Sequence, residues 1–282
     1  PCGSLPNDDE LIALLLDICR RRRVHIGLQV IVVVFLLSLW DLNLNSAAIW
    51  TGFALFAGAY SFATREDVAP RSALLLVFFL CGTICTLRQN YLAPAGLFAF
   101  LIAVYHVRTR AKELGSWGQA LRSDRKLLLL AIAAAAVGVI PYMIATFREC
   151  GTFLYPVLLG TGNPALPLKP TANTFLNELS FFGDVIFSSE PIKIWLVLVP
   201  MMLLAVDTRA RKPFPAYLIA CGVGFVILVH SFQLSDTYNL WRYAFAYLSP
   251  LAVLFAIETA HNLPFGAEEG TSFKVPKIVA LI

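Results

Sequence analysis

Arg88 and Arg242 are the two residues of this chain best suited to chemistry. Arg88 ends an apolar segment in CTLRQNYLAPAG, and Arg242 opens another in NLWRYAFAYLSPL, with Tyr243 beside it. Tyr91, three residues after Arg88, is a further candidate for substrate binding or, alternatively, an aromatic residue of the membrane interface. A guanidinium that faces a cavity at the edge of a membrane binds phosphate through paired, charge-assisted hydrogen bonds. The alternative is structural, because arginines near helix ends extend their head groups to the membrane–water interface, where tyrosine and tryptophan also gather.

Acid–base chemistry would need a carboxylate on the same side of the membrane. Asp41, Asp184 and Asp236 lie between apolar segments and are suited to act as general base or metal ligand. For each of them a solvated loop charge or a helix cap is the commoner role, and Asp41 is the best candidate for the base. Arg148 directly follows another apolar segment, where it either joins the phosphate site or pairs with Glu149, a surface contact that contributes little to stability.

Several familiar motifs of enzyme chemistry are missing from the chain. It has no P-loop, no dinucleotide-binding glycine pattern, no HExxH and no CxxC pair. Cys81 and Cys85 lie one helical turn apart and favour helix packing over metal binding, because two thiols do not complete a metal site. The sequence therefore predicts no cofactor, leaves the need for a divalent metal open, and does not support ATP-driven transport.

The elements that position these residues have the composition of membrane spans. The 282-residue chain is 58% hydrophobic and 14% charged, with a mean hydropathy of +0.72, whereas soluble domains carry about 25% charged residues. Lipid must therefore cover most of the apolar surface. We predict an all-α transmembrane helical bundle whose eight spans lie at about 24–40, 47–62, 72–87, 91–107, 127–147, 192–206, 216–233 and 244–257.

The basic residues predict how this bundle is oriented. All but five of the 22 lysines and arginines lie in alternate connections, which the positive-inside rule places in the cytoplasm. The five exceptions are Arg88, Arg148, Lys169, Lys193 and Arg242. We therefore predict an integral protein of the cell (inner) membrane with its site on the extracytoplasmic face. Because topology accounts for the net charge of +4, no nucleic-acid partner is expected.

The chain is predicted to form a single transmembrane domain over residues 1–282. Its parts are a truncated or interfacial helix (1–23), five spans (24–147), an extracytoplasmic loop (148–191), three spans (192–257) and a cytoplasmic tail (258–282). The apolar run LIALLLDIC in the first part is too short to span, and the choice between a truncated and an interfacial helix stays open. The long, half-apolar loop favours a functional role. The missing initiator methionine predicts a piece of a longer protein.

Three passages resemble the type C glycosyltransferases, polytopic membrane enzymes that use sugars linked to polyprenyl or dolichyl phosphate. WRYAFAYLSPLAVLFA is similar to the segment that opens a late transmembrane helix in that family. TLRQNYLAPAGLFAFLIAV resembles its mid-chain helix pair, and VIPYMIATFRECGTFLYPVLLGTGNP resembles the passage into its long extracytoplasmic loop. The three passages match in order and in predicted side, and the resemblance extends over residues 24–260.

The resemblance implies a glycosyltransferase that moves a sugar from a polyprenyl-phosphate-linked donor to a protein, lipid or glycan acceptor. Arg88 and Arg242 match the contacts to the lipid phosphate, and Tyr243 matches a neighbour that packs there. The family's acidic loop follows its first span and would precede Pro1, so Asp41 is the best substitute within this chain. The alternatives are a transporter or flippase of a lipid-linked or anionic solute, which the absence of Asp and Glu inside the spans disfavours, and a noncatalytic membrane scaffold.

Overall fold

All regular secondary structure in the described part of the chain is helical. The computed structural model describes residues 8–21, 47–153, 176, 177, 180, 183, 184, 213–231 and 237–260. Its elements are α1 (Asp8–Arg21), α3 (Ala47–Thr64), α4 (Pro70–Leu87), the 3-10 turn η2 (Gln89–Tyr91), α5 (Leu92–Leu114), α6 (Trp117–Cys150), α9 (Pro213–Ser231) and α10 (Thr237–Ala260). The predicted spans 24–40 and 192–206, Asp41 and most of the predicted loop 148–191 lie outside the described residues. Within that part, the all-α prediction is confirmed.

Three of the described helices are long and apolar enough to cross a membrane. They are Pro70–Leu87, Leu92–Leu114 and Trp117–Glu149, and they contain the predicted spans 72–87, 91–107 and 127–147. Shorter apolar helices at Pro213–Val229 and Tyr243–Leu254 and helix α3 occupy three further predicted positions. These lengths and compositions indicate a membrane protein.

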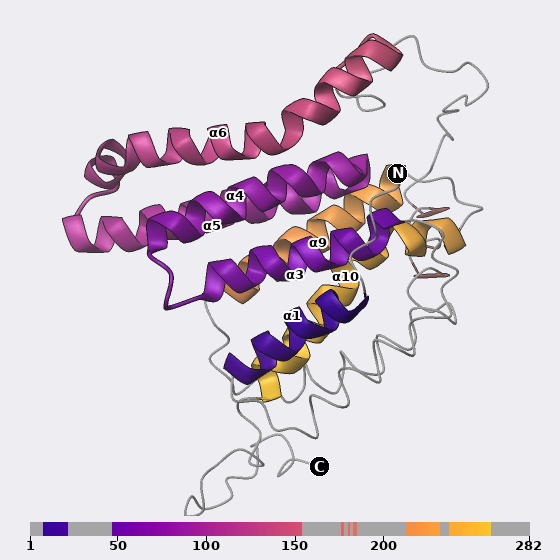
Figure 1. The fold of residues 1–282 in the computed structure, drawn as a ribbon, viewed down its shortest axis with the longest axis horizontal. Coiled ribbons are helices and arrows are strands. Elements are labelled where there is room, and N and C mark those ends of the chain that lie inside the picture. Colours follow the sequence, from indigo (N-terminus) through magenta and orange to yellow (C-terminus); the bar gives the residue numbers. More distant parts are fainter. Residues whose placement is uncertain are drawn as a thin grey trace, which may run out of the picture.

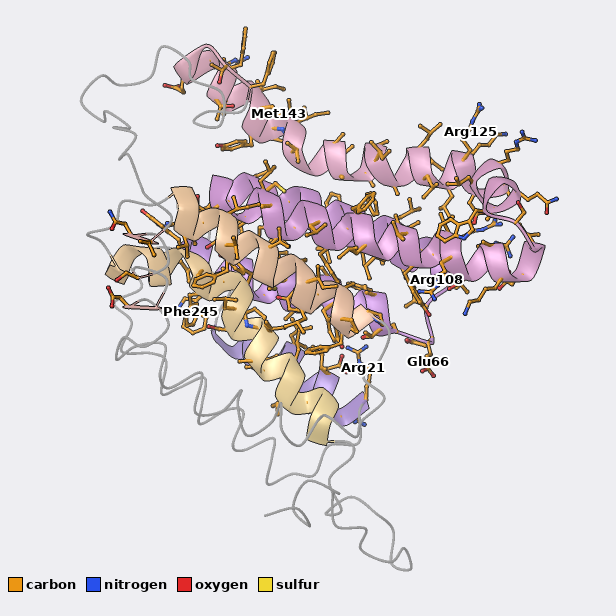
Figure 2. All side chains as sticks on the ribbon, turned by 180° about the vertical axis from the view of Figure 1, so that it is seen from behind. Arg21, Glu66, Arg108, Arg125, Met143 and Phe245 are labelled. Carbon is orange, nitrogen blue, oxygen red and sulfur yellow. The ribbon has the colours of Figure 1, made fainter. Side chains whose placement is uncertain are left out.

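Helices α3 to α6 form an up-and-down run joined by short turns (Figure 1). Helix α4 lies between α3 and α6, α5 packs against α4 and α9, and α10 packs against α3 and α9. We call the end where α3 stops and α4 starts the basic end, and the opposite end, at η2, the Arg88 end. Figure 2 shows Arg108 and Arg125 toward the same end as Glu66, with Phe245 toward the opposite end.

The basic connection predicted at 108–126 is almost wholly helical. Helix α5 continues to Leu114 and α6 begins at Trp117, so only Gly115 and Ser116 separate them. Gly115 has a φ of 76°, the left-handed conformation that glycine adopts readily at a helix C-terminus. The charged residues of this segment favour helix almost as well as the apolar ones, so both helices continue beyond their apolar stretches. The connection is therefore two helix ends and a tight turn.

Helix α6 lies at the edge of the bundle. Only 6% of its apolar stretch is buried, compared with 33% in α4 and in α5. Its exposed side chains include Leu129, Leu130, Ile132 and Val137. Beyond Pro141, which lies inside the helix, α6 bends near Met143 and diverges from its neighbours (Figure 2). An internal proline removes one backbone hydrogen bond and bends a helix, so the bend has a local cause.

Helix α1 is packed onto the bundle. It has 14 residues, about 21 Å at 1.5 Å per residue, which is shorter than a membrane span. Leu15, Ile18 and Cys19 are buried in the main hydrophobic core, and Arg21 donates to Ser61 of α3 at 2.8 Å. The structure therefore gives this segment a packed position beside α3.

Candidate functional site

The centre of the candidate site is a contact between Arg88 and Tyr243. The guanidinium carbon of Arg88 lies 4.7 Å from the centroid of the Tyr243 ring, within the range of a cation–π interaction. Both side chains are half-buried. The two residues belong to the two passages that the sequence singled out separately, and the fold brings them together at one end of the bundle.

Arg88 is held in place by the junction between α4 and η2. It is the C-cap of α4, with extended backbone, φ −158° and ψ 141°. Its carbonyl oxygen accepts a hydrogen bond from the Tyr91 backbone N–H at 3.0 Å, which starts the 3-10 turn. A cation at a helix C-terminus also interacts favourably with the helix dipole. The short turn therefore fixes the backbone from which the guanidinium extends.

Tyr243 is positioned by close packing of α10 against α3. A methyl group added at Gly52 would lie 3.0 Å from both Ala246 Cβ and Tyr91 Cε2, so the absence of a side chain lets these segments meet. Next to this contact, the rings of Trp50 and Phe245 pack edge to face with centroids 5.4 Å apart. Aromatic pairs of this geometry add stability beyond the burial of their area. The start of α10 is therefore tightly held.

Tyr91 has a different position from the one expected of an interfacial or substrate-binding side chain. Its side chain is fully buried, with ring centroids 6.1 Å from Phe56 and 6.4 Å from Tyr247. The turn at Gln89–Tyr91 directs the ring into the core, because η2 packs against α4, α5, α9 and α10. The prediction of Tyr91 at a surface is corrected here: it packs behind the site and supports the turn that carries Arg88.

Arg148, another candidate whose side chain the structure describes, lies apart from this pair. Arg148 is exposed near the end of α6, the part of that helix that diverges from the bundle (Figure 1). It forms no ion pair with Glu149, since adjacent residues of a helix point in different directions. Arg242 lies in the second turn of α10, next to Tyr243, and its side chain lies outside the described residues, as does the whole of Asp41.

A polar cluster that the sequence analysis did not single out joins the basic ends of α5 and α6. The side chain of Asp124 is only 3% exposed, and its Oδ2 lies 3.1 Å from His106 Nε2 and 3.5 Å from Arg110 Nε. Arg110 also pairs with Glu113. The sequence does not indicate this cluster, because Asp124 belongs to α6 and its partners belong to α5. The residues meet only when the two helices pack antiparallel. A buried carboxylate with such partners holds two helices in register.

Replacing Asp124 with alanine is expected to lower the free energy of unfolding by about 1–3 kcal/mol, the usual cost of leaving buried polar partners unsatisfied. The measurement is denaturation of the purified protein in detergent. Glu149→Ala, which removes an exposed carboxylate, is the matched control and should change stability little. Equal stability of the two variants would contradict a structural role for the cluster.

The described residues contain no group of three or more His, Cys, Asp and Glu side chains placed to hold a metal ion. The chemical groups at the Arg88 end are instead a guanidinium and aromatic rings. The N–H groups of a guanidinium lie in its plane and bind the oxygens of a phosphate in that plane. An aromatic ring contacts the face of the guanidinium instead. The arrangement is thus suited to an anion with an apolar portion beside it.

The described part of the fold defines this chain as a helical membrane protein with an arginine–tyrosine pair at one end of the described helices. No protein-family model, no curated protein and no solved structure matches it.

Proposed function

We propose that this chain is a membrane glycosyltransferase that uses a polyprenyl-phosphate-linked sugar and acts on the extracytoplasmic side. The observation that carries the proposal is the 4.7 Å contact between Arg88 and the Tyr243 ring. It supports the proposal because it joins residues from two of the three passages that carry the resemblance, although these passages are far apart in the chain. The acceptor is a protein, lipid or glycan hydroxyl.

In the proposed reaction, the bond between the sugar's anomeric carbon and the donor phosphate breaks, and its electron pair stays on the phosphate. The acceptor oxygen forms the new bond to the anomeric carbon, and its proton goes to a carboxylate, for which Asp41 is the proposed base. Arg88 and Arg242 stabilise the charge that develops on the leaving phosphate. Tyr243 restricts the orientation of the Arg88 guanidinium, so less side-chain conformational entropy is lost when the phosphate binds.

The lipid character of the donor fits the surroundings of the site. A polyprenyl chain must lie in the bilayer while its phosphate stays at the membrane boundary. Arg88 stands at the end of α4, a helix apolar enough to cross a membrane, and the site begins where that apolar stretch ends. Half-buried aromatic and cationic groups at such a boundary stabilise an anion with an apolar tail.

The test is transfer of a labelled sugar from a polyprenyl-phosphate donor by the full chain in proteoliposomes. We expect a labelled glycosylated product with wild type and little product with Arg242→Ala, at unchanged expression and stability. Normal transfer by Arg242→Ala would remove this arginine from the site. Movement of the donor across the bilayer without any product would contradict the enzyme and favour the transporter or flippase.

A further inference from the structure

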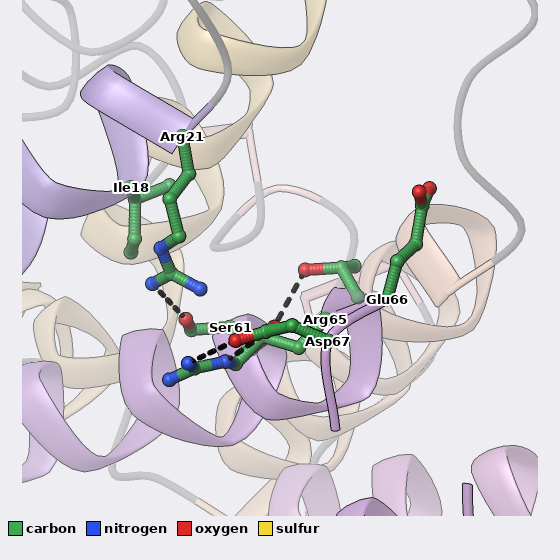
Figure 3. Close-up of a pocket in the computed structure, with 7 residues that line it drawn as sticks. Ile18, Arg21, Ser61, Arg65, Glu66 and Asp67 are labelled. Atoms are coloured by element: carbon green, nitrogen blue, oxygen red, sulfur yellow. Dashed lines mark hydrogen bonds and ion pairs between the residues drawn. The ribbon is translucent and has the colours of Figure 1, made fainter. Parts of the chain in front are cut away.

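A cavity of about 350 Å³ lies at the basic end, away from the Arg88 end, where α1 and α3 stop (Figure 3). Its lining residues are Ile18, Arg21, Ser61, Thr64, Arg65, Glu66 and Asp67. The volume is in the range of small-molecule sites. Helix α4 begins at Pro70, so the cavity borders the apolar stretch of a helix that is long enough to cross a membrane.

Arg21 forms one side of this cavity. It donates to Ser61 Oγ at 2.8 Å and pairs with Asp17 at 2.7 Å. Ser61 is only 5% exposed, so this hydrogen bond holds the guanidinium against α3. Arg21 is therefore oriented before any ligand arrives, and its side chain is still 30% exposed.

Arg65 and Asp67 form the facing side. Arg65 donates from Nε and Nη2 to the two carboxylate oxygens of Asp67, at 2.9 and 2.5 Å. The pKa of Asp67 is lowered to about 2, chiefly by this hydrogen bonding with Arg65 and least by the charge of Arg21. Asp67 is therefore ionised at neutral pH, and the two ion pairs are close enough to influence each other.

The charges of the lining decide which ligand fits. Arg21 is paired with Asp17, and Arg65 with Asp67. Glu66 and Asp67 in the lining oppose an anion near the arginines, and the arginines oppose a simple cation. A zwitterion carries both charges, so its anionic group can approach the arginines and its cationic group the carboxylates while both ion pairs stay formed. At a membrane boundary, the abundant small zwitterions with a phosphate are phospholipid head groups.

We propose that this cavity binds a phosphoethanolamine group, with its phosphate at Arg21 and Arg65 and its primary ammonium at Glu66 and Asp67. The ammonium carries three hydrogen-bond donors for the carboxylates. A choline group has the same charges but no N–H donor, and a glycerol head group has the phosphate without the cation. The cavity should therefore distinguish these three head groups, and this selectivity is independent of the chemistry at Arg88.

Native mass spectrometry of the delipidated full chain tests this directly, with phosphatidylethanolamine, phosphatidylcholine and phosphatidylglycerol offered at equal concentration. We expect phosphatidylethanolamine to bind about tenfold more tightly than either other lipid, which equals about 1.4 kcal/mol. Arg65→Gln should weaken the binding of all three lipids, because each of them carries the phosphate. Arg71→Gln removes an exposed arginine at the same end, outside the cavity lining, and should keep both the wild-type affinity and the wild-type preference.

Glu66→Gln keeps the proposal testable if loss of Arg65 disturbs folding, because Glu66 is exposed. This variant should bind the ethanolamine and choline lipids equally and the glycerol lipid more tightly than wild type does. Water-soluble phosphoethanolamine identifies the source: competition shows that the head group alone suffices, and selective lipid binding without competition shows that the ligand is the lipid. Equal binding of the three lipids by wild type, or unchanged lipid affinity in Arg65→Gln, would overturn the proposal.

Discussion

Arg88→Ala is expected to lower the rate of sugar transfer by about 100-fold or more, which is the usual effect of removing one preoriented donor from a developing anion. The guanidinium is set for this role before the donor binds, because η2 fixes its backbone and the Tyr243 ring lies 4.7 Å from its carbon. The measurement is kcat/KM for transfer from a labelled polyprenyl-phosphate sugar. Arg88→Lys should recover only part of the rate, since lysine keeps the charge and loses the paired geometry.

Arg108→Ala is the matched control, because Arg108 is exposed and lies toward the basic end (Figure 2). It should transfer sugar at the wild-type rate. A wild-type rate in Arg88→Ala would contradict the assignment of Arg88 and leave it as an interfacial anchor.

Two substitutions of Tyr243 separate positioning from packing within the same experiment. Tyr243→Phe keeps the ring face and should retain most of the transfer activity, whereas Tyr243→Leu removes the cation–π contact, whose contribution is about 0.5–2 kcal/mol. A few-fold loss of kcat/KM in the leucine variant alone is expected. If both variants were equally active, the ring would not position Arg88 for catalysis.

Gly82→Ala is expected to lower the free energy of unfolding by about 1–3 kcal/mol, the usual cost of overpacking. A methyl group at Gly82 would lie 2.2 Å from the Ala135 carbonyl oxygen, and one at Gly138 would lie 2.7 Å from the Thr83 backbone nitrogen. These contacts are with backbone, which cannot rotate away, so α4 and α6 would have to separate. Small residues allow such close approach between membrane helices, where packing replaces the hydrophobic effect as the driving force.

The natural comparison is Gly96→Ala in α5, where nothing lies within 4 Å of the added methyl group. That substitution should leave stability unchanged or raise it by up to about 1 kcal/mol, because alanine favours helix over glycine. Both variants are measured by reversible denaturation in the same detergent. Equal stability of Gly82→Ala and Gly96→Ala would show that the α4–α6 contact is looser than the structure has it.

The apolar helices were predictable because the mean hydropathy of a segment depends only on its own residues and not on tertiary contacts. The stretches 72–87, 91–107 and 127–147 contain enough apolar residues to identify α4, α5 and α6 without any tertiary contact. Their ends were less predictable. The charged residues at 108–126 look like a loop in hydropathy, yet they extend two helices, because helix propensity does not follow hydropathy.

The candidate site was predictable in part. Arg88 and Tyr243 could be named because few cations occur at that end of the apolar segments. The burial of Tyr91 could not be foreseen, since a tyrosine beside an apolar segment is equally typical of an interface and of a core. Asp124 was overlooked for a similar reason, because a charged residue next to Arg125 and Lys126 looks like part of a solvated connection.

The sequence by itself determined which segments are apolar helices and at which of their ends the arginines collect. Both properties depend only on residue type and order. The tertiary structure alone decided which side chains meet: Tyr243 at Arg88, Asp124 at His106, and Arg21 beside the α3–α4 turn. Each residue along a helix turns the side chain by about 100°, so a contact depends on how every helix is rotated and how closely it packs. Glycines such as Gly52 and Gly82 allow neighbouring helices to approach closely because they have no Cβ atom, and this role is seen only in the packed structure.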